Sequence, residues 1–351
     1  PAARKVDACT PRRSPEEKLV ASLIALMEGG TAPWRRPWDE NSGGHHVNLL
    51  SGRRYRGSNP ALLSFGMQLR GSSLPYWCGF AEAKAQGLAP RRGSQAVHVL
   101  RPQLLQSRDA LPQGAESPLV ADAAHDARSR GALSTAENSQ DEAGAIRPRR
   151  VLYRPVPVFN AADLEGEGLA ALIQARRATA ARERRPEPER LHSAEAILRR
   201  WPVPVIPGGD CACYLPEADR IHLPERAAFH SAAAHVATWA HEAIHSTGHP
   251  SRLSRDLSGV MGAAGERGKA YAREELVAEL GAVLLGDRLE IGSDTCNHAA
   301  YLSHWIALLR ESPRLLLQVL SEARKAADLI VPEVLPTAET TDAQPRPAPS
   351  C

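Results

Sequence analysis

The sequence predicts an α+β protein of two domains, a small mixed α/β N-terminal domain followed by a mostly helical C-terminal domain. The chain has 351 residues, enough for about two or three domains that each bury a core. Its 43% hydrophobic and 24% charged residues are typical of a globular protein, which excludes a wholly disordered chain. Strand-like segments are expected in the first half, and helical segments dominate the second.

The N-terminal domain is expected over residues 15–178, behind a short tail at 1–14. Within it, strand-like runs at 95–100 and 150–159 flank residues 106–146, which are rich in Ala, Ser, Gln, Asp and Glu and contain no aromatic residue. This composition cannot bury enough apolar surface to offset the entropy of ordering, so the segment is predicted to be a disordered insertion. The simplest arrangement is a long loop between two strands of one sheet.

A dense run of charged residues with two prolines predicts a linker at 179–191, ahead of a C-terminal domain at 192–332. Residues 333–351 are rich in Pro and Thr and are predicted to form a disordered tail. Helices are expected near 192–200, 228–247, 270–290, 297–311 and 312–330, with a strand–turn–strand unit near 202–224.

The small net charge of +3 hides a basic N-terminal region. Residues 1–105 contain 15 Lys or Arg and 7 Asp or Glu, a surplus that attracts phosphate backbones. Aromatic residues gather in the same stretch and alternate with arginines, and stacking platforms beside guanidinium groups suit sequence-tolerant binding of single-stranded nucleic acid. The alternative is that the aromatic residues form the core and the arginines a solvated face. The candidate contacts are Trp34, Arg35, Arg36, Trp38, Arg53, Arg54, Tyr55, Arg56, Tyr76, Trp77, Arg91 and Arg92.

The sharpest motif is the pair His241 and His245, four residues apart on an expected helix. Residues at this spacing lie about 40° apart around the helix axis, so both imidazoles can reach one metal ion. Glu242 follows the first histidine and is placed to polarise a metal-bound water rather than to bind the metal. Gly248 and Pro250 then end the helix, which puts the motif at its C-terminal end.

A third protein ligand is expected from the helix near 270–290, because a three-ligand zinc site with one open position needs it. Glu275 and Glu279 share one face of that helix, so we assign Glu275 to the metal and Glu279 to a hydrogen bond with a ligating histidine. Two alternatives remain: Glu274 or Glu279 is the ligand, or these glutamates form a solvated face with Arg273. Two imidazoles and a carboxylate favour Zn²⁺, although Mn or Co could occupy such a site.

The order of these motifs resembles a known family, the ArdC-type antirestriction proteins. The C-terminal part is similar to the zincin-like metallopeptidase domain of that family, and the N-terminal part to its single-stranded-DNA-binding domain. The matching C-terminal residues are Gly209-Asp210, Tyr214, Asp219 to Pro224, Phe229, His241 to His249, Arg252-Leu253 and Tyr271 to Glu279. The matching N-terminal residues are Gly30 to Trp34, Pro37-Trp38, Asn48, Gly52-Arg53, Tyr55 to Gly57, Asn59, Tyr76-Trp77, Phe80, Ala83, Gly93 and Val158 to Asn160.

The resemblance implies a single-stranded-DNA-binding antirestriction protein of a mobile element such as a plasmid, with a zinc-dependent metallopeptidase-like domain. It also adds Asn59 to the candidate DNA contacts. Two other hypotheses are an active zinc metallopeptidase recruited to DNA, which would act on an unidentified protein substrate, and a primase-associated plasmid accessory protein. The sequence departs from the family after Trp77. Where the family has polar Thr, Lys and Gln residues, this chain has Gly79, Ala81 and Glu82.

The cysteines and the hydropathy set an expectation for the compartment. Six cysteines are scattered without a CxxC pair, which is not the pattern of a disulfide-stabilised secreted domain. No run approaches the roughly 18–20 consecutive apolar residues of a membrane helix. We therefore expect a cytoplasmic protein without membrane contact.

Overall fold

The fold is that of a computed structural model, which describes residues 15–30, 44–104, 120–121, 151–257, 268–293 and 302–333. Four of the candidate DNA contacts fall outside these ranges, namely Trp34, Arg35, Arg36 and Trp38. The expected tails at 1–14 and 333–351 also fall outside, apart from residue 333, and so does the expected insertion at 106–146, apart from residues 120–121.

A five-stranded sheet organises the N-terminal part. Its strands are β1 (Val47–Asn48), β2 (Tyr76–Cys78), β6 (Val151–Asn160) and β4 (Val97–Leu104) in spatial order, and β5 (Val120–Ala121) also pairs with β6. The β4–β6 ladder is antiparallel and runs from the Val97–Val158 pair to the Leu104–Val151 pair. The two strand-like runs around the expected insertion therefore pair in one sheet, as predicted. Within the insertion, β5 is a strand where disorder was expected.

Three helices accompany this sheet: α1 (Pro15–Glu28), α2 (Asn59–Arg70) and α3 (Phe80–Ala85). Helix α2 begins with a proline in its first turn, where the missing N–H costs no hydrogen bond, and ends at Gly71, whose φ of 57° is left-handed. A two-stranded sheet of β3 (Ala89–Pro90) and β7 (Leu164–Glu165) follows α3, with a 3-10 turn at Ala161–Asp163 ahead of β7.

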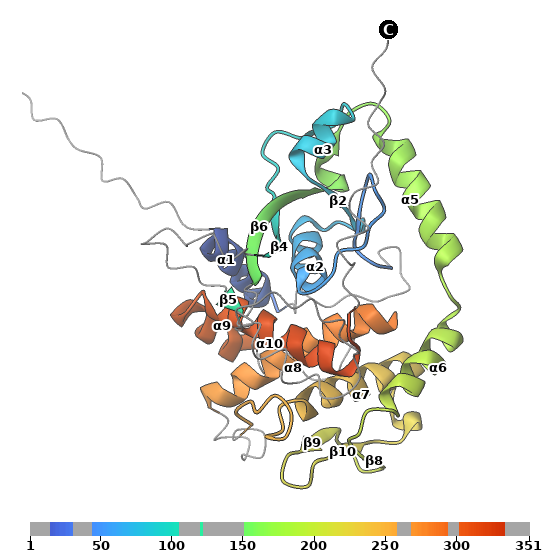
Figure 1. The fold of residues 1–351 in the computed structure, drawn as a ribbon, viewed down its shortest axis with the longest axis vertical. Coiled ribbons are helices and arrows are strands. Elements are labelled where there is room, and N and C mark those ends of the chain that lie inside the picture. Colours follow the sequence, from blue (N-terminus) through green and yellow to red (C-terminus); the bar gives the residue numbers. More distant parts are fainter. Residues whose placement is uncertain are drawn as a thin grey trace, which may run out of the picture.

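Two helices occupy most of the stretch 179–191 that the charge pattern assigns to a linker. Helix α5 (Leu169–Glu183) runs along one side of the molecule towards α6 (Glu187–Leu198), as Figure 1 shows. Only residues 184–186 lie outside a helix, so the expected linker is corrected to a three-residue connection. The prolines do not break α6, because Pro186 caps the helix and Pro188 lies in its first turn.

The C-terminal part is mostly helical, as expected. A three-stranded sheet has the order β8 (Val205–Pro207), β10 (Arg220–Leu223) and β9 (Cys213–Leu215), which leaves β9 at an edge. A 3-10 turn at Arg226–Ala228 follows the sheet. The remaining helices are α7 (Ala232–Ser246), α8 (Lys269–Leu289), α9 (Leu302–Glu311) and α10 (Leu315–Ile330). The fold is thus α+β, and each helix expected after residue 191 is present.

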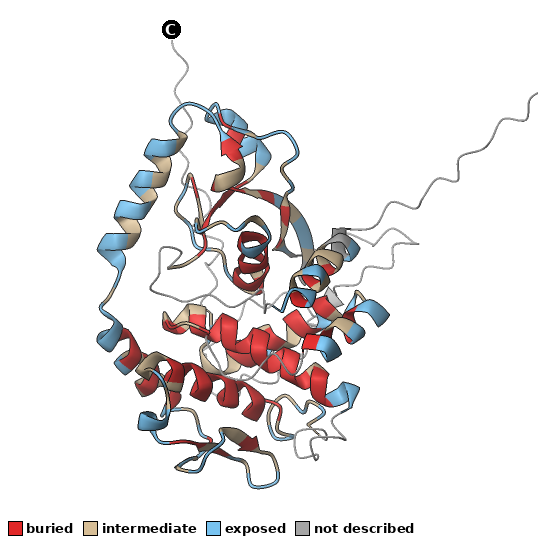
Figure 2. Cartoon of the chain, turned by 180° about the vertical axis from the view of Figure 1, so that it is seen from behind, coloured by how far each residue is buried: buried red, intermediate tan, exposed pale blue. Residues whose placement is uncertain are grey.

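The largest hydrophobic core joins both parts of the chain. Leu23 of α1 and Phe65 of α2 belong to the same buried cluster as Val236 of α7, Leu276 of α8 and Leu320 of α10. Figure 2 shows α7 and α8 as buried over most of their length, whereas α5 is exposed or half-buried. The boundary that the sequence predicts between two domains therefore does not separate two cores. None of the described helices is both long and apolar enough to cross a membrane.

Candidate metal centre

Helix α7 carries the two histidines at its buried C-terminal end. The helix starts where the Ser231 hydroxyl accepts a hydrogen bond from the Ala234 N–H, and it ends at Ser246. The Gly248 N–H then bonds the His245 carbonyl at 2.9 Å, as expected for the end of the helix. His241 and His245 are only 7% and 3% exposed, so both imidazoles are shielded from solvent.

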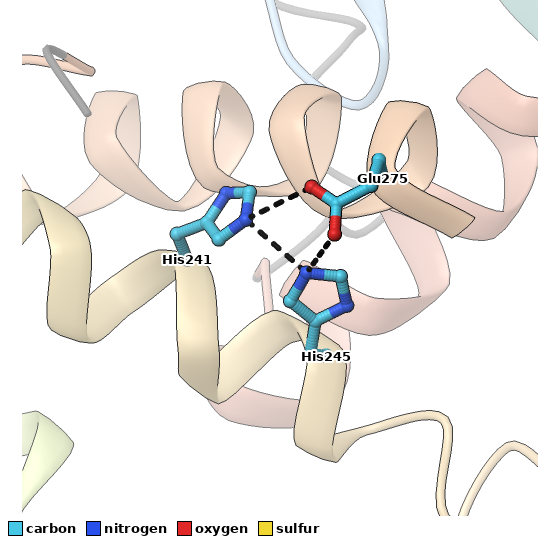
Figure 3. Close-up of side chains that lie close together, drawn as sticks. All are labelled: His241, His245 and Glu275. Atoms are coloured by element: carbon cyan, nitrogen blue, oxygen red, sulfur yellow. Dashed lines mark hydrogen bonds and ion pairs between the residues drawn. The ribbon is translucent and has the colours of Figure 1, made fainter. Parts of the chain in front are cut away.

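The imidazoles converge on a carboxylate of α8 (Figure 3). The two Nε2 atoms lie 3.2 Å apart, and the Glu275 oxygens lie 3.8 Å from Nε2 of His241 and 3.5 Å from Nε2 of His245. One donor atom from each of these residues falls within 4.8 Å of the others. Two neutral imidazoles and one carboxylate form a donor set that could hold a divalent metal. The structure thus brings together the three residues that the sequence proposes as ligands.

The remaining ring nitrogen of His245 faces Glu274, a partner that the sequence does not identify. His245 Nδ1 lies 3.2 Å from Glu274 Oε1, and Arg255 donates hydrogen bonds of 2.8 and 2.7 Å to the two oxygens of the same carboxylate. Arg255 also donates to the Thr247 hydroxyl at 2.7 Å. Together these contacts fix the His245 ring with Nε2 turned towards His241, an orientation suited to metal binding.

Burial acts to raise the pKa of Glu274, but the hydrogen bonds from Arg255 and His245 outweigh it, so the pKa lies below its usual value. In His245, burial acts to lower the pKa, but the charge of Glu275 and the hydrogen bond to Glu274 prevail and raise it to about 9. His245 and Glu274 thus lie in a buried ion-pair contact of 3.2 Å.

Glu279 lies beside the other histidine. Its carboxylate is 3.8 Å from Nδ1 of His241, on the side of the ring away from His245. This is the neighbourhood expected for a carboxylate that orients a ligating histidine, although the distance is an ion-pair contact rather than a hydrogen bond. Glu274, Glu275 and Glu279 are 2%, 7% and 1% exposed. The alternative of a solvated glutamate face is therefore wrong.

Glu242 is a buried carboxylate next to the two histidines. It is 7% exposed, and burial raises its pKa to about 7. A hydrogen bond with the backbone of Tyr214 acts to lower this pKa. The same hydrogen bond shows that the edge strand β9 lies beside the Glu242 carboxylate. A carboxyl group with a pKa near neutrality can both accept and return a proton at physiological pH, which is what a general base requires.

A second network fixes β9 against the end of α7. Asp219 accepts hydrogen bonds from the Tyr214 hydroxyl at 2.8 Å and from Arg252 at 3.0 Å. Arg252 also donates to the Ser246 carbonyl at 2.7 Å, one residue after His245. In the sequence these residues stand out only as matches to the family and have no assigned role, because they meet only when the turn before β10 folds onto the helix end.

The candidate DNA contacts divide by burial. Exposed side chains are those of Arg53, Arg54, Arg56, Arg91 and Arg92, whereas Tyr55 and Asn59 are half-buried. Tyr76 and Trp77 are buried, and the Trp77 indole N–H donates to Nδ1 of His46 at 3.1 Å. Neither ring offers a face to a base, so both are corrected to core residues. Asn59 bonds the backbone N–H and carbonyl of Leu100, at 2.7 and 3.0 Å, which ties α2 to β4.

Comparisons with known proteins agree with this architecture. The model of the N-terminal domain of the anti-restriction factor ArdC matches residues 14–148, and the model of a zincin-like metallopeptidase matches residues 192–322. Two DNA primases named TraC from Escherichia coli are similar to most of this chain. The first is 33% identical over 90% of this chain, and the second is 30% identical over 93%. The matched region spans only 27% and 20% of the length of these primases. An uncharacterized protein of Sinorhizobium fredii is 29% identical over 89% of this chain and 90% of its own.

Solved structures give the same result along the length of the chain. Crystal structures of the antirestriction ArdC protein from the R388 plasmid match with TM-scores of 0.57 for the metal-free form and 0.58 for the Mn(II)-bound form. The metal-free structure is 28% identical in sequence, and the match covers 90% of this chain and 96% of the ArdC chain. The Mn(II)-bound structure is 27% identical, and the match covers 91% of this chain and 97% of the ArdC chain. The chain belongs to the ArdC antirestriction family, with an ArdC N-terminal domain followed by a zincin-like metallopeptidase domain.

Proposed function

We propose that this protein is a single-stranded-DNA-binding antirestriction protein of a mobile element, with one divalent metal, Zn²⁺ by preference, at its α7–α8 site. The observation that carries the metal assignment is the convergence of His241, His245 and Glu275 within 4.8 Å. Zinc suits two imidazoles and one carboxylate, but the solved ArdC relative with Mn(II) bound supports manganese as the competing ion.

The chain's own residues take distinct parts at this site. His241, His245 and Glu275 would hold the metal, which when bound supplies a Lewis acid. Glu274 accepts the Nδ1 proton of His245 and so keeps its Nε2 free to bind. Glu242, with a pKa of about 7, takes up or returns a proton at its carboxylate.

The DNA-binding part of the proposal rests on charge and on the family match. Among the described residues, the loop after β1 presents Arg53, Arg54 and Arg56, and the turn after β3 presents Arg91 and Arg92, all with exposed side chains. Exposed guanidinium groups on a net basic segment bind phosphates without reading bases. Binding to single strands irrespective of sequence would suit a protein that shields incoming DNA from restriction.

An active metallopeptidase recruited to DNA is the second candidate. The buried Glu242 favours it, because a site that serves only to stabilise the fold needs no general base. The likeness to the TraC primases favours a primase-associated accessory protein, but the chain spans at most 27% of those relatives. Both candidates predict the same metal site and differ in what the metal is used for.

The test uses the full chain, because its two parts share one core. Fluorescence anisotropy with labelled single- and double-stranded oligonucleotides of the same sequence should show tighter binding to the single strand and weaker binding as salt rises. Metal analysis of the same sample should give about one ion per chain. Absence of single-strand binding at low salt would overturn the antirestriction assignment, while hydrolysis of a general protease substrate that Glu242→Gln abolishes would favour the peptidase.

A further inference from the structure

Phe80 stands apart from the other aromatic residues in the described part of the chain. Its side chain is 53% exposed, whereas all other aromatic side chains there are buried or half-buried. Exposing a phenylalanine forgoes the favourable free energy that burial of its ring would contribute. The buried Tyr76 and Trp77 precede it on β2, so the chain passes directly from core aromatics to an exposed one.

The turn after β1 packs against the start of α3, where Phe80 lies. The Glu82 carboxylate accepts hydrogen bonds from the Gly79 N–H at 2.9 Å and from the Asn48 side-chain amide at 3.0 Å. Asn48 in turn shapes the loop, because its side chain accepts the Ser51 N–H at 2.8 Å and its backbone N–H donates to the Arg53 carbonyl at 2.9 Å. Glu82 is therefore engaged in joining the loop to the helix, which explains why a carboxylate is tolerated on a basic surface.

Two exposed cations lie on the loop and the helix that these hydrogen bonds join. Lys84 lies four residues after Phe80, on the same face of α3, and Arg53 lies on the loop that Glu82 fixes to this helix. An exposed aromatic ring with a lysine and an arginine nearby is the combination that lets a base stack while its flanking phosphates are neutralised. Figure 1 shows α3 at the end of the molecule away from α7, so this surface is separate from the metal site.

We infer that Phe80 is the stacking residue of the single-stranded-DNA surface, with Lys84 and Arg53 contacting the flanking phosphates. This inference rests on the proposed single-strand binding and names the residues that perform it. Stacking on Phe80 needs a base but no particular base, because every base presents a π-face. The surface therefore binds any unpaired strand, whereas a duplex, whose bases stack on one another, offers only its phosphates.

The experiment measures anisotropy of the full chain with two labelled strands of equal length, an oligothymidine and a strand of abasic sites with the same phosphates. Phe80→Ala should weaken oligothymidine binding about 10-fold or more with an unchanged salt slope, and Phe80→Trp should retain it. Binding to the abasic strand should be the same for wild type and Phe80→Ala. Leu69→Ala is the matched control, since Leu69 is 42% exposed on α2 and should leave both affinities unchanged.

The two proposals fail in different ways. If wild type binds neither strand at low salt, the proposed function fails and this inference fails with it. If wild type binds oligothymidine and Phe80→Ala binds it equally well, the function stands and the inference is overturned. An equal loss by Phe80→Ala on the abasic strand would also overturn it, because that loss cannot come from stacking. Lys84→Ala and Arg53→Ala should each lower the salt slope by roughly one unit.

Discussion

Charged side chains are buried at the site between α7 and α8 but exposed on the surface around α3. At the first, Glu242, Glu274, Glu275 and Glu279 are all at most 7% exposed, and each lies against a histidine, an arginine or a backbone amide. At the second, Arg53 and its neighbouring arginines are exposed. Burying four carboxylates is costly unless a cation or donor compensates each of them, whereas exposed arginines cost almost nothing. Under the proposed function, the buried site would hold one small ion and the exposed surface would contact a long anion.

The largest expected effect is loss of the metal, which should distinguish the metal ligands from the general base at the buried site. His241→Ala or His245→Ala should abolish metal binding, because either change leaves only two protein donors. Glu242→Gln should keep the metal, because this side chain acts on a proton and not on the ion. Metal content after dialysis, measured by atomic emission, checks both changes, and full retention by the alanine variants would show that the ion binds elsewhere.

The next effect contrasts a core aromatic with the exposed one. Trp77→Ala should destabilise the fold by about 3–5 kcal/mol, because it empties a fully buried site and removes the hydrogen bond to His46. Phe80→Ala should change stability by less than about 0.5 kcal/mol, as for an ordinary surface substitution. Thermal melts of both variants make the comparison, and a stable Trp77→Ala protein with weakened DNA binding would restore Trp77 as a contact.

The secondary contacts of the metal site should give a smaller effect. Glu274→Ala should weaken metal binding about 10–100-fold, since it removes the acceptor that orients His245, while Glu275→Ala should cost more because it removes a donor to the ion. Arg273→Ala is the control, because its guanidinium pairs with Glu322 instead. Metal competition with a chelating dye ranks the three, and a Glu274→Ala loss larger than that of Glu275→Ala would exchange their roles.

The smallest effect concerns the contact between the N-terminal part of the chain and the end of α8. His45 lies 3.2 Å from Asp287 of α8 and 3.5 Å from Glu290, the residue that follows this helix. The Glu290 carboxylate also forms ion pairs with Arg185 at 2.8 Å and with Arg54 at 3.6 Å. Burial acts to lower the pKa of His45, but its hydrogen bonds to the two carboxylates raise it overall. The hydrogen bond from His45 is the main cause that lowers the pKa of Glu290 to about 2.

The sign of the pH dependence follows from these two shifts. A raised histidine pKa contributes stability that is complete below the usual value of 6.5 and is lost as pH rises through the higher folded value. The lowered Glu290 pKa contributes above its usual value of 4.5 and is lost as pH falls towards 2. His45→Asn should therefore lower Tm by a few degrees near pH 5.5 and by less at pH 8 or above. A deficit that grows with pH would contradict the charged contact.

The sequence predicted the metal site better than the DNA surface because the two depend on different kinds of pattern. Four-residue spacing fixes His241 and His245 on one helix face whatever surrounds them, and α8 presents Glu275 by the same periodicity. Glu274 was missed as the partner of His245 because Arg255 reaches it only in the folded chain. Composition located the aromatic cluster but could not distinguish the buried Trp77 from the exposed Phe80.

X-ray absorption at the zinc edge of the zinc-loaded full chain tests the central claim, that one ion is held by two imidazoles and a carboxylate between α7 and α8. Two histidine nitrogens and a carboxylate oxygen are expected at about 2.0–2.2 Å from the zinc, with no sulfur. A sulfur shell at about 2.3 Å would contradict it. Such a result would move the ion towards Cys213 of β9, which lies close enough to Glu242 for its charge to raise the thiol pKa further above the value that burial sets.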